Sequence, residues 1–440
     1  MTKGIVICDW RALALEPNDT IRLGHRRSGW GEKQSFGLSV PDSRQHLVVI
    51  GKTGAGKTTL LFNLLVQHIE AGRGVMLIDP HGDFSERLLD YIPPWRFDHV
   101  TYFNPSDVEH PIGLNPLADI DLLKRHLVVA GVVSCFKSLW PDAWGPRLEY
   151  LLTNAVASLS YCQNVTLLGI PRLFTEARYR RWVIRQVKDP LLRHFWIEEF
   201  ERYDDRFLRE AIAPVQNKVN QFVMTPLLRN ILGQVKNKVS PRFIMDNGRI
   251  FIANLSRGKL GETPANLLGS LLVTQFQLAA MGRADVPEDK RRDFTLVVDE
   301  FHAFTTDSFT TILSEARKYR LCLVLAHQFT EQLSPELRAA IFGNVGTIIV
   351  FRVGSRDAEI LEREFMGEFS AAQLVDLPRY HAGVRLLEDG ENRAPFMAEM
   401  LPPLGHCYGR KEKLIRHSRE RFAAPRAVVE DKIQRWLGQV

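Results

Sequence analysis

The side chains best suited to chemistry in this chain lie in one glycine-rich segment. Residues 51–58 read Gly-Lys-Thr-Gly-Ala-Gly-Lys-Thr, and four residues separate Gly51 from the Gly56-Lys57-Thr58 triplet. Glycines in such a turn let successive backbone N–H groups converge on phosphate oxygens. A lysine at the position of Lys57 reaches the β- and γ-phosphates, and a hydroxyl at the position of Thr58 ligates Mg²⁺. The segment therefore predicts a site for a nucleoside triphosphate.

The flanking sequence supplies the strand and the helix that this turn requires. Residues 47–50 are apolar, and five apolar residues between Leu60 and Ile69 recur at helical spacing before Gly72. The amino end of such a helix directs its positive dipole end at a bound phosphate. A glycine-rich turn without nucleotide is the alternative, and the presence of both elements disfavours it. We expect the nucleotide to be bound by Gly51, Thr53, Gly54, Ala55, Gly56, Lys57, Thr58 and Thr59.

Two adjacent acids form the second part of the predicted site. The apolar run 295–298 ends in Asp299 and Glu300. Acid pairs after strands are common, but together with a phosphate-binding turn upstream this pair is expected to be catalytic. Asp299 is predicted to join Thr58 in the Mg²⁺ shell, and Glu300 to polarise the water that attacks the γ-phosphate.

A further apolar run, 321–326, ends in His327 and Gln328. Because the carboxyl ends of parallel strands line the ligand crevice, Gln328 is predicted to sense the γ-phosphate; a plain loop residue is the alternative. The basic segment before this strand offers Arg317, or else Arg320, as an arginine supplied across a subunit boundary to stabilise transition-state charge. Charges at helix ends that merely face water are the alternative there. Arg352 is a further candidate.

The segment Asp79-Pro-His-Gly-Asp83 follows another predicted strand. It has the look of a metal cluster, but no further ligands stand at suitable spacing, so an outer part of the nucleotide pocket is favoured. No Asn-Lys-x-Asp sequence of the kind that commonly selects guanine is present, which favours ATP.

Composition limits the class of protein. The 440 residues carry a formal net charge of +6, which favours an anionic partner only weakly. The five cysteines are scattered without a Cys-x-x-Cys pair, as in a reduced cytoplasmic protein. Neither a transmembrane run nor a signal peptide is recognisable. Any membrane role is therefore expected to come through a partner.

The order of the predicted elements indicates an α/β fold. Strands and helices alternate first over 46–118 and again over 246–403, which predicts a largely parallel sheet with helices on both faces. Residues 119–245 lack convincing strands and are predicted to be an all-helical inserted domain. Residues 1–45 are expected to form a small strand-bearing leader. Residues 404–440 are expected to form a basic arm with a terminal helix that docks on something else.

With these residues in view, the chain resembles the HerA/FtsK branch of phosphate-loop motors, and most of all the type IV secretion coupling proteins of the TraD/TraG sort. The resemblance extends from about residue 20 to 437. It depends on the segments 51–58, 77–83, 111–117, 297–301, 327–328 and 351–359, which read GKTGAGKT, LIDPHGD, PIGLNPL, VVDEF, HQ and FRVGSRDAE.

The resemblance implies a RecA-like motor domain that carries an all-helical domain. It implies a ring of six copies that hydrolyses ATP with Mg²⁺ at subunit interfaces and moves DNA through a central channel. Lys57 and Thr58 would then bind nucleotide, Asp299 and Glu300 the metal and the water, Gln328 would be the sensor and Arg317 the arginine acting in trans. Coupling proteins typically carry transmembrane helices ahead of the motor, whereas this sequence begins almost directly with it. A secretion channel or a relaxase would accordingly be reached through other proteins.

An ATP-driven DNA translocase with sequence-independent backbone contacts is therefore the leading hypothesis. The candidate grip segments are 256–259 and 283–292, and a plain solubilising role is the alternative for both. A motor that moves or assembles proteins is the second hypothesis. The third is a nucleotide-gated binding module with little turnover, which Glu300 disfavours.

Overall fold

The computed structural model describes residues 20–27, 31–306 and 309–438. The remainder of the predicted leader, residues 1–19 and 28–30, lies outside the described residues. Described leader residues form two strands, and these strands join the main sheet instead of forming a unit apart from it.

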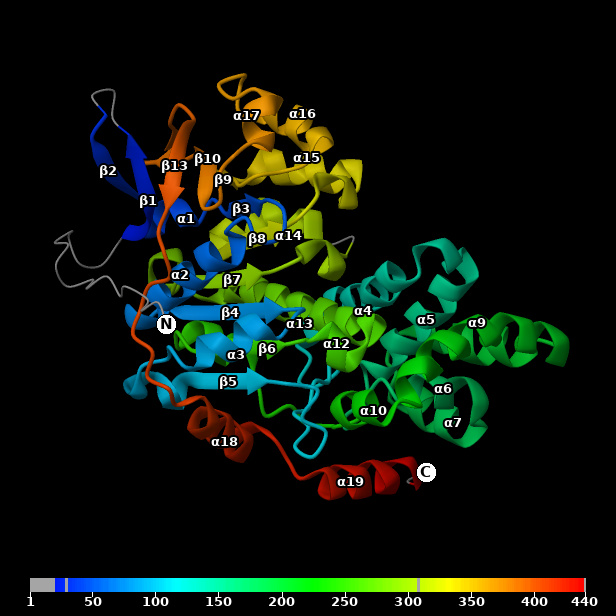
Figure 1. Ribbon diagram of the computed structural model, residues 1–440. Helices are drawn as coiled ribbons and strands as arrows, with labels where there is room; N and C mark the ends of the chain where they lie inside the picture. The colour runs from blue at the N-terminus through cyan, green and yellow to red at the C-terminus, as the bar shows by residue number, and fades with distance from the viewer. Residues whose placement is uncertain (1–19, 28–30, 307–308, 439–440) are drawn as a thin grey trace.

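One eleven-stranded sheet organises the molecule (Figure 1). Seven neighbouring strands are parallel, and four antiparallel strands extend the sheet on one side. Their order is β2 (Lys33–Ser39), β1 (Thr20–Arg27), β13 (Phe396–Met400), β10 (His381–Arg385), β9 (Thr347–Val350), β3 (Leu47–Ile50), β8 (Leu321–His327), β7 (Phe294–Val298), β4 (Gly74–Asp79), β6 (Ile250–Asn254) and β5 (Val100–Phe103).

Both faces of the parallel strands are buried, as their uninterrupted apolar sequences predict. On β3, Leu47 and Val49 join a core with α2 (Lys57–Glu70), α3 (Asp83–Leu89) and α18 (Lys411–Phe422). Val48 and Ile50 point the other way, into a core with helices that include α13 (Glu262–Gly282), α14 (Phe309–Glu315), α15 (Pro335–Asn344) and α16 (Ser355–Glu364). The sheet is thereby held rigidly between two helical layers.

The described residues between β5 and β6 contain helices, turns and loops but no strand. Their core combines aliphatic and aromatic side chains; the fully buried Trp196, for example, donates from Nε1 to Ser158 Oγ at 2.7 Å. Figure 1 shows the arrowheads of β4, β5 and β7 pointing toward this region, so it faces the carboxyl edge of the sheet. The helices are α4 (Arg125–Leu139), α5 (Pro146–Leu159), α6 (Gly169–Thr175), α7 (Ala177–Gln186), α8 (Pro190–His194), α9 (Asp205–Val223), α10 (Pro226–Leu232) and α11 (Pro241–Asp246).

The C-terminal arm corrects one expectation, because it packs along its own chain instead of projecting away. Ser418 Oγ of α18 accepts a hydrogen bond of 2.9 Å from Tyr102 N of β5. Val429 and Ile433 of α19 (Arg426–Gly438) pack against Leu168 in the helical region. The arm therefore connects the edge of the sheet to the helical region (Figure 1).

No helix of the described residues combines the length and the apolar character that crossing a membrane would require.

Candidate nucleotide-binding and catalytic site

The predicted phosphate-binding turn connects β3 to α2 at the carboxyl edge of the sheet. Gly54 and Gly56 have φ of 75° and 134°, values that side-chain-bearing residues rarely adopt. A Cβ atom on Gly51 would lie 2.7 Å from Phe351 Cβ, and one on Gly56 would lie 2.8 Å from the Phe351 ring. By contrast, a Cβ on Gly54 would meet nothing within 4 Å. The turn is thus packed against Phe351, which follows β9, at Gly51 and Gly56, and is open at Gly54.

Lys57 begins α2 and is buried, with 6% of its surface exposed. Its Nζ donates to Gly51 O, and to Lys52 O at 3.4 Å. Burial lowers the pKa of Lys57, while the nearby carboxylates of Glu300 and Asp299 raise it in part. A desolvated ammonium beside an open turn of backbone N–H groups fits a phosphate ligand. Thr58 is exposed and Thr59 half-buried in the same first turn of α2.

Asp299 and Glu300 follow β7, and each is 5% exposed. Burial, together with Glu300 and Asp79, raises the pKa of Asp299 to about 6, while Lys57 and His81 act in the opposite direction. Two desolvated carboxylates side by side repel each other unless a bound cation offsets their charge. This environment fits a divalent metal ion, with Thr58 supplying the hydroxyl.

Gln328 connects three of the predicted parts. Its Nε2 donates to Glu300 Oε1 at 2.6 Å, and its Oε1 accepts from Thr53 Oγ1 at 3.0 Å. Glu300 itself has a left-handed backbone, with φ of 48°. A non-glycine residue is held in this region only when its surroundings fix it. The turn, the predicted sensor and the predicted water-polarising acid therefore form one hydrogen-bonded unit.

His302 completes the surroundings of Glu300, with Nδ1 3.6 Å from Glu300 Oε2. Burial lowers the pKa of His302, so the ring is neutral near pH 7. A neutral ring brings no positive charge to the surroundings of Glu300.

The Asp79 segment lies next to the acids, as an outer part of the site would. Asp79 is fully buried, and its carboxylate accepts from His81 N at 2.9 Å and from Ser85 N at 2.8 Å. Both oxygens thus fix the turn that leads into α3. Through its charge Asp79 also raises the pKa of Asp299.

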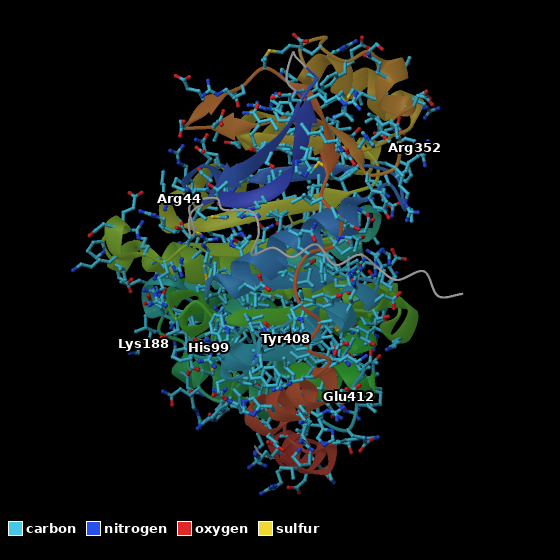
Figure 2. The ribbon with its side chains drawn as sticks, turned by 60° about the vertical axis from the view of Figure 1, so that its left-hand side comes forward. Arg44, His99, Lys188, Arg352, Tyr408 and Glu412 are labelled. Carbon is cyan, nitrogen blue, oxygen red and sulfur yellow. The ribbon has the colours of Figure 1, made fainter. Side chains whose placement is uncertain are left out.

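The predicted arginines lie in different places. Arg317 is exposed shortly before β8 begins, at the amino edge of the sheet, so it does not reach the site of its own chain. Arg320 is paired with Asp293, with 3.8 Å between Arg320 Nη1 and Asp293 Oδ2. Arg352 follows β9 beside the phosphate-binding turn, where its carbonyl accepts from Lys52 N at 2.8 Å. Its exposed side chain is labelled at the periphery of the molecule in Figure 2, far from Glu412 of α18.

Three residues next to the site were not predicted to be site residues, although Phe351 and Asp357 lie within segment 351–359. Asp357 of α16 is buried and accepts from Thr330 N at 2.8 Å and from Thr330 Oγ1 at 2.5 Å, which ties the segment after Gln328 to α16. Phe351 supports the glycines from behind. Tyr380 packs against the front of the turn, where its N donates to Ala55 O at 2.9 Å. Only the folded chain brings these residues together.

Comparisons with known proteins agree with this geometry. Residues 28–270, more than half of the chain, match the family model described as "Helicase HerA, central domain". No curated protein sequence matches the chain. Among solved structures, the plasmid coupling protein TrwB in complex with the non-hydrolysable ATP analogue ADPNP aligns with a TM-score of 0.64 and 16% identity, over 90% of this chain and 97% of the TrwB chain.

Two further structures are similar. TrwB in complex with ADP and Mg²⁺ gives a TM-score of 0.61 at 15% identity, over 90% of this chain and 97% of that one. VirB4 of Thermoanaerobacter pseudethanolicus gives 0.54 at 14% identity, over 91% and 99%. At these identities the likeness shows the fold, so the predicted RecA-like phosphate-loop sheet with a helical insertion is confirmed. The chain belongs to the HerA helicase central-domain family.

Proposed function

We propose that this chain is an ATP-driven DNA translocase that hydrolyses ATP at the interfaces of a ring of copies. One observation carries the hydrolytic part: the hydrogen-bonded unit in which Gln328 joins Thr53 of the phosphate-binding turn to Glu300. A site that only bound nucleotide would have less need of a buried carboxylate held beside the phosphate-binding turn.

Each side chain has a defined task in this proposal. Lys57 and the backbone N–H groups of residues 51–58 bind the phosphates. Gln328 engages Glu300 Oε1 and leaves Oε2 to accept a proton from water. The water oxygen forms a bond to the γ-phosphorus, and the bond from that phosphorus to the bridging oxygen of ADP breaks. Bound Mg²⁺, held by Thr58 and Asp299, would offset the charge that develops on the phosphates.

The hydrogen-bonded unit of Thr53, Gln328 and Glu300 would also respond to loss of the γ-phosphate. Gln328 is two residues from Thr330, and Thr330 is bonded to Asp357 of α16. A displacement of Gln328 would therefore be passed to α16 through a buried pair of hydrogen bonds. In this proposal residues 46–118 and 246–403 form the motor, 119–245 the helical domain, 1–45 the leader and 404–440 the arm.

The DNA part of the proposal is supported by membership of a helicase family and by a row of basic residues along α7 and just beyond its end. Arg178, Arg181, Arg185 and Lys188 recur at three- or four-residue spacing, and all four are exposed. Among the described residues, none of these four side chains has a hydrogen bond or an ion pair. Lys188 is labelled near the edge of the molecule in Figure 2. Unpaired cations in a row suit a phosphodiester backbone, with contacts that weaken as salt is added.

The segments first considered for gripping DNA fit less well. Arg283 is fully buried, with Nε 2.9 Å from Asp246 Oδ1, and it donates to Arg292 O at 2.8 Å. It therefore supports the amino edge of the sheet and is not available to bind DNA. In segment 256–259, Lys259 lies 3.3 Å from Glu86. In each segment at least one of the cations is thus already held by the chain itself.

ATP turnover of the pure chain, measured with and without single- and double-stranded DNA at low and moderate salt, tests the proposal. We expect DNA to stimulate turnover at low salt and the stimulation to fade as salt rises. Turnover that both kinds of DNA leave unchanged at low salt would contradict DNA as the cargo and favour a motor that moves or assembles proteins. Absence of turnover under all conditions would contradict the motor itself.

A further inference from the structure

The two ends of a nucleotide must lie on opposite sides of the phosphate-binding turn. In the sheet, β3 lies between β9 on one side and β8 and then β7 on the other. The acids and Gln328 follow β7 and β8, so the γ-phosphate must point to that side. The nucleoside must then extend toward the segments that follow β9 and precede β10. This inference deepens the proposed function and depends on it.

Tyr380 is the side chain that faces this region. A Cβ atom on Gly56 would lie 3.2 Å from Tyr380 Cδ1, so the ring lies against the turn itself. The ring is nevertheless open to solvent, and 37% of the residue is exposed. Large aromatic side chains that remain exposed beside a ligand turn are suited to contact a ligand.

The backbone of Tyr380 is fixed in an unusual conformation. Its φ is 64°, in the left-handed region that tyrosine rarely adopts. Its N donates to Ala55 O at 2.9 Å, and its carbonyl accepts from Met400 N at 2.8 Å. The phosphate-binding turn and β13 therefore hold the backbone of Tyr380 from both sides. Such strain is found where the position of a side chain matters to function.

A flat group from an exposed side chain covers one face of the ring. The guanidinium of the exposed Arg379 lies 4.8 Å from the centroid of the Tyr380 ring. A planar base is similar in thickness and can take that position, and the flexible arginine can move outward. We propose that Tyr380 forms the platform on which the base of the bound nucleotide stacks.

Stacking has a signature that phosphate binding lacks. Removal of the ring should weaken binding of ADP but leave inorganic tripolyphosphate unaffected, because only ADP has a base. Removal of one base–aromatic stack weakens binding by about tenfold. Since every base has a π-face, GDP should lose affinity by the same factor as ADP.

Calorimetric titration of the full chain with ADP, GDP and tripolyphosphate, each with Mg²⁺, tests the inference. The variant Tyr380→Asn removes the ring and keeps a residue that tolerates the left-handed backbone. The variant Tyr380→Phe keeps the ring, and unfolding temperatures of both variants establish that they fold. We expect Tyr380→Asn to bind ADP and GDP about tenfold more weakly and tripolyphosphate as the wild type does, with Tyr380→Phe unchanged.

The outcomes separate the two proposals. Wild-type affinity of Tyr380→Asn for ADP would overturn the stacking role and leave the proposed function standing. Equal weakening for ADP and tripolyphosphate would also overturn it, because the ring would then serve only to shape the turn. If the wild type binds none of the three ligands, the proposed function fails together with the inference.

Discussion

Glu300 has two oxygens with different surroundings. Oε1 accepts from Gln328 at 2.6 Å, and Oε2 lies 3.6 Å from His302. The change Glu300→Gln keeps the size of the side chain and removes its basicity. We expect ATP turnover to fall about 100-fold or more while ATP is still bound, because a positioned base contributes that factor to the chemical step alone. Turnover and nucleotide affinity measured on the same preparation check this, and a large loss of affinity would contradict it.

Gln328 is hydrogen-bonded to both Thr53 and Glu300. We expect Gln328→Ala to lower kcat about tenfold or more, since a hydrogen bond to a charged group contributes roughly 1.5–3 kcal/mol, and to change KM little. Gln328→Glu keeps the length but places a second negative charge against Glu300, and should lower kcat further. A rise in KM with unchanged kcat would show that Gln328 serves only to bind nucleotide.

Among single residues, the sequence predicts those that belong to a motif of fixed spacing along the chain. The turn at 51–58 and the pair Asp299 and Glu300 follow fixed spacings, and the fold brings them together. The bonds of Gln328 to Thr53 and of Asp357 to Thr330 join residues that are 275 and 27 positions apart. No local pattern specifies such pairings, so neither the contact of Asp357 with Thr330 nor the position of Tyr380 beside the turn could be predicted.

Among the secondary-structure elements, the parallel strands are predicted well and the antiparallel ones poorly. The apolar runs 295–298 and 321–326 agree with β7 and β8 within a residue, because continuous apolar runs mark strands buried on both faces. The strands β10 and β13 were not expected. Their sequences, His-Ala-Gly-Val-Arg and Phe-Met-Ala-Glu-Met, are short and contain few β-branched residues. Pairing with β9 and β1 decides their conformation.

The helix α7 allows a prediction about DNA. The double change Arg181→Glu and Arg185→Glu reverses the charge at the centre of its exposed row. We expect weaker DNA binding and a less steep dependence of affinity on salt, by about 0.7–0.9 in the log–log slope for each phosphate that the variant no longer binds. The same charge change on α18, Lys413→Glu with Arg416→Glu, is the control. DNA affinity measured across a series of salt concentrations tests this prediction. Equal effects of the two double variants would show that only the net charge of the chain matters.

The whole molecule must meet a second copy if Arg317 acts in catalysis, because Arg317 lies at the edge of the sheet remote from its own site. We expect Arg317→Ala and Glu300→Gln each to be inactive alone and a mixture to recover activity. In randomly mixed rings about a quarter of the interfaces would combine an intact acid with an intact arginine from the neighbour. Recovery in mixtures made with Arg352→Ala, but not with Arg317→Ala, would assign the role to Arg352.

The stability of the whole chain should depend on pH through its buried histidines. Burial lowers the pKa of His46 to about 4 and that of His68 to about 3, while an unfolded histidine titrates near 6.5. The folded state therefore excludes protons that the unfolded state binds. The stability that comes from keeping these histidines neutral is fully present above pH 6.5. It is lost as the pH falls from 6.5 toward their pKa values in the folded state.

Denaturant unfolding at pH 7, 6 and 5 measures this loss. For each buried histidine, the free energy of unfolding should fall by about 1.4 kcal/mol for each pH unit below 6.5, until the folded pKa is reached. The variant His68→Gln cannot take up that proton, so its stability should fall less steeply by this amount. His126→Gln, at an exposed position of α4, is the control and should follow the wild type. If His68→Gln loses stability as steeply as the wild type, the acid sensitivity originates elsewhere, because glutamine cannot bind the proton that the unfolded histidine would take up.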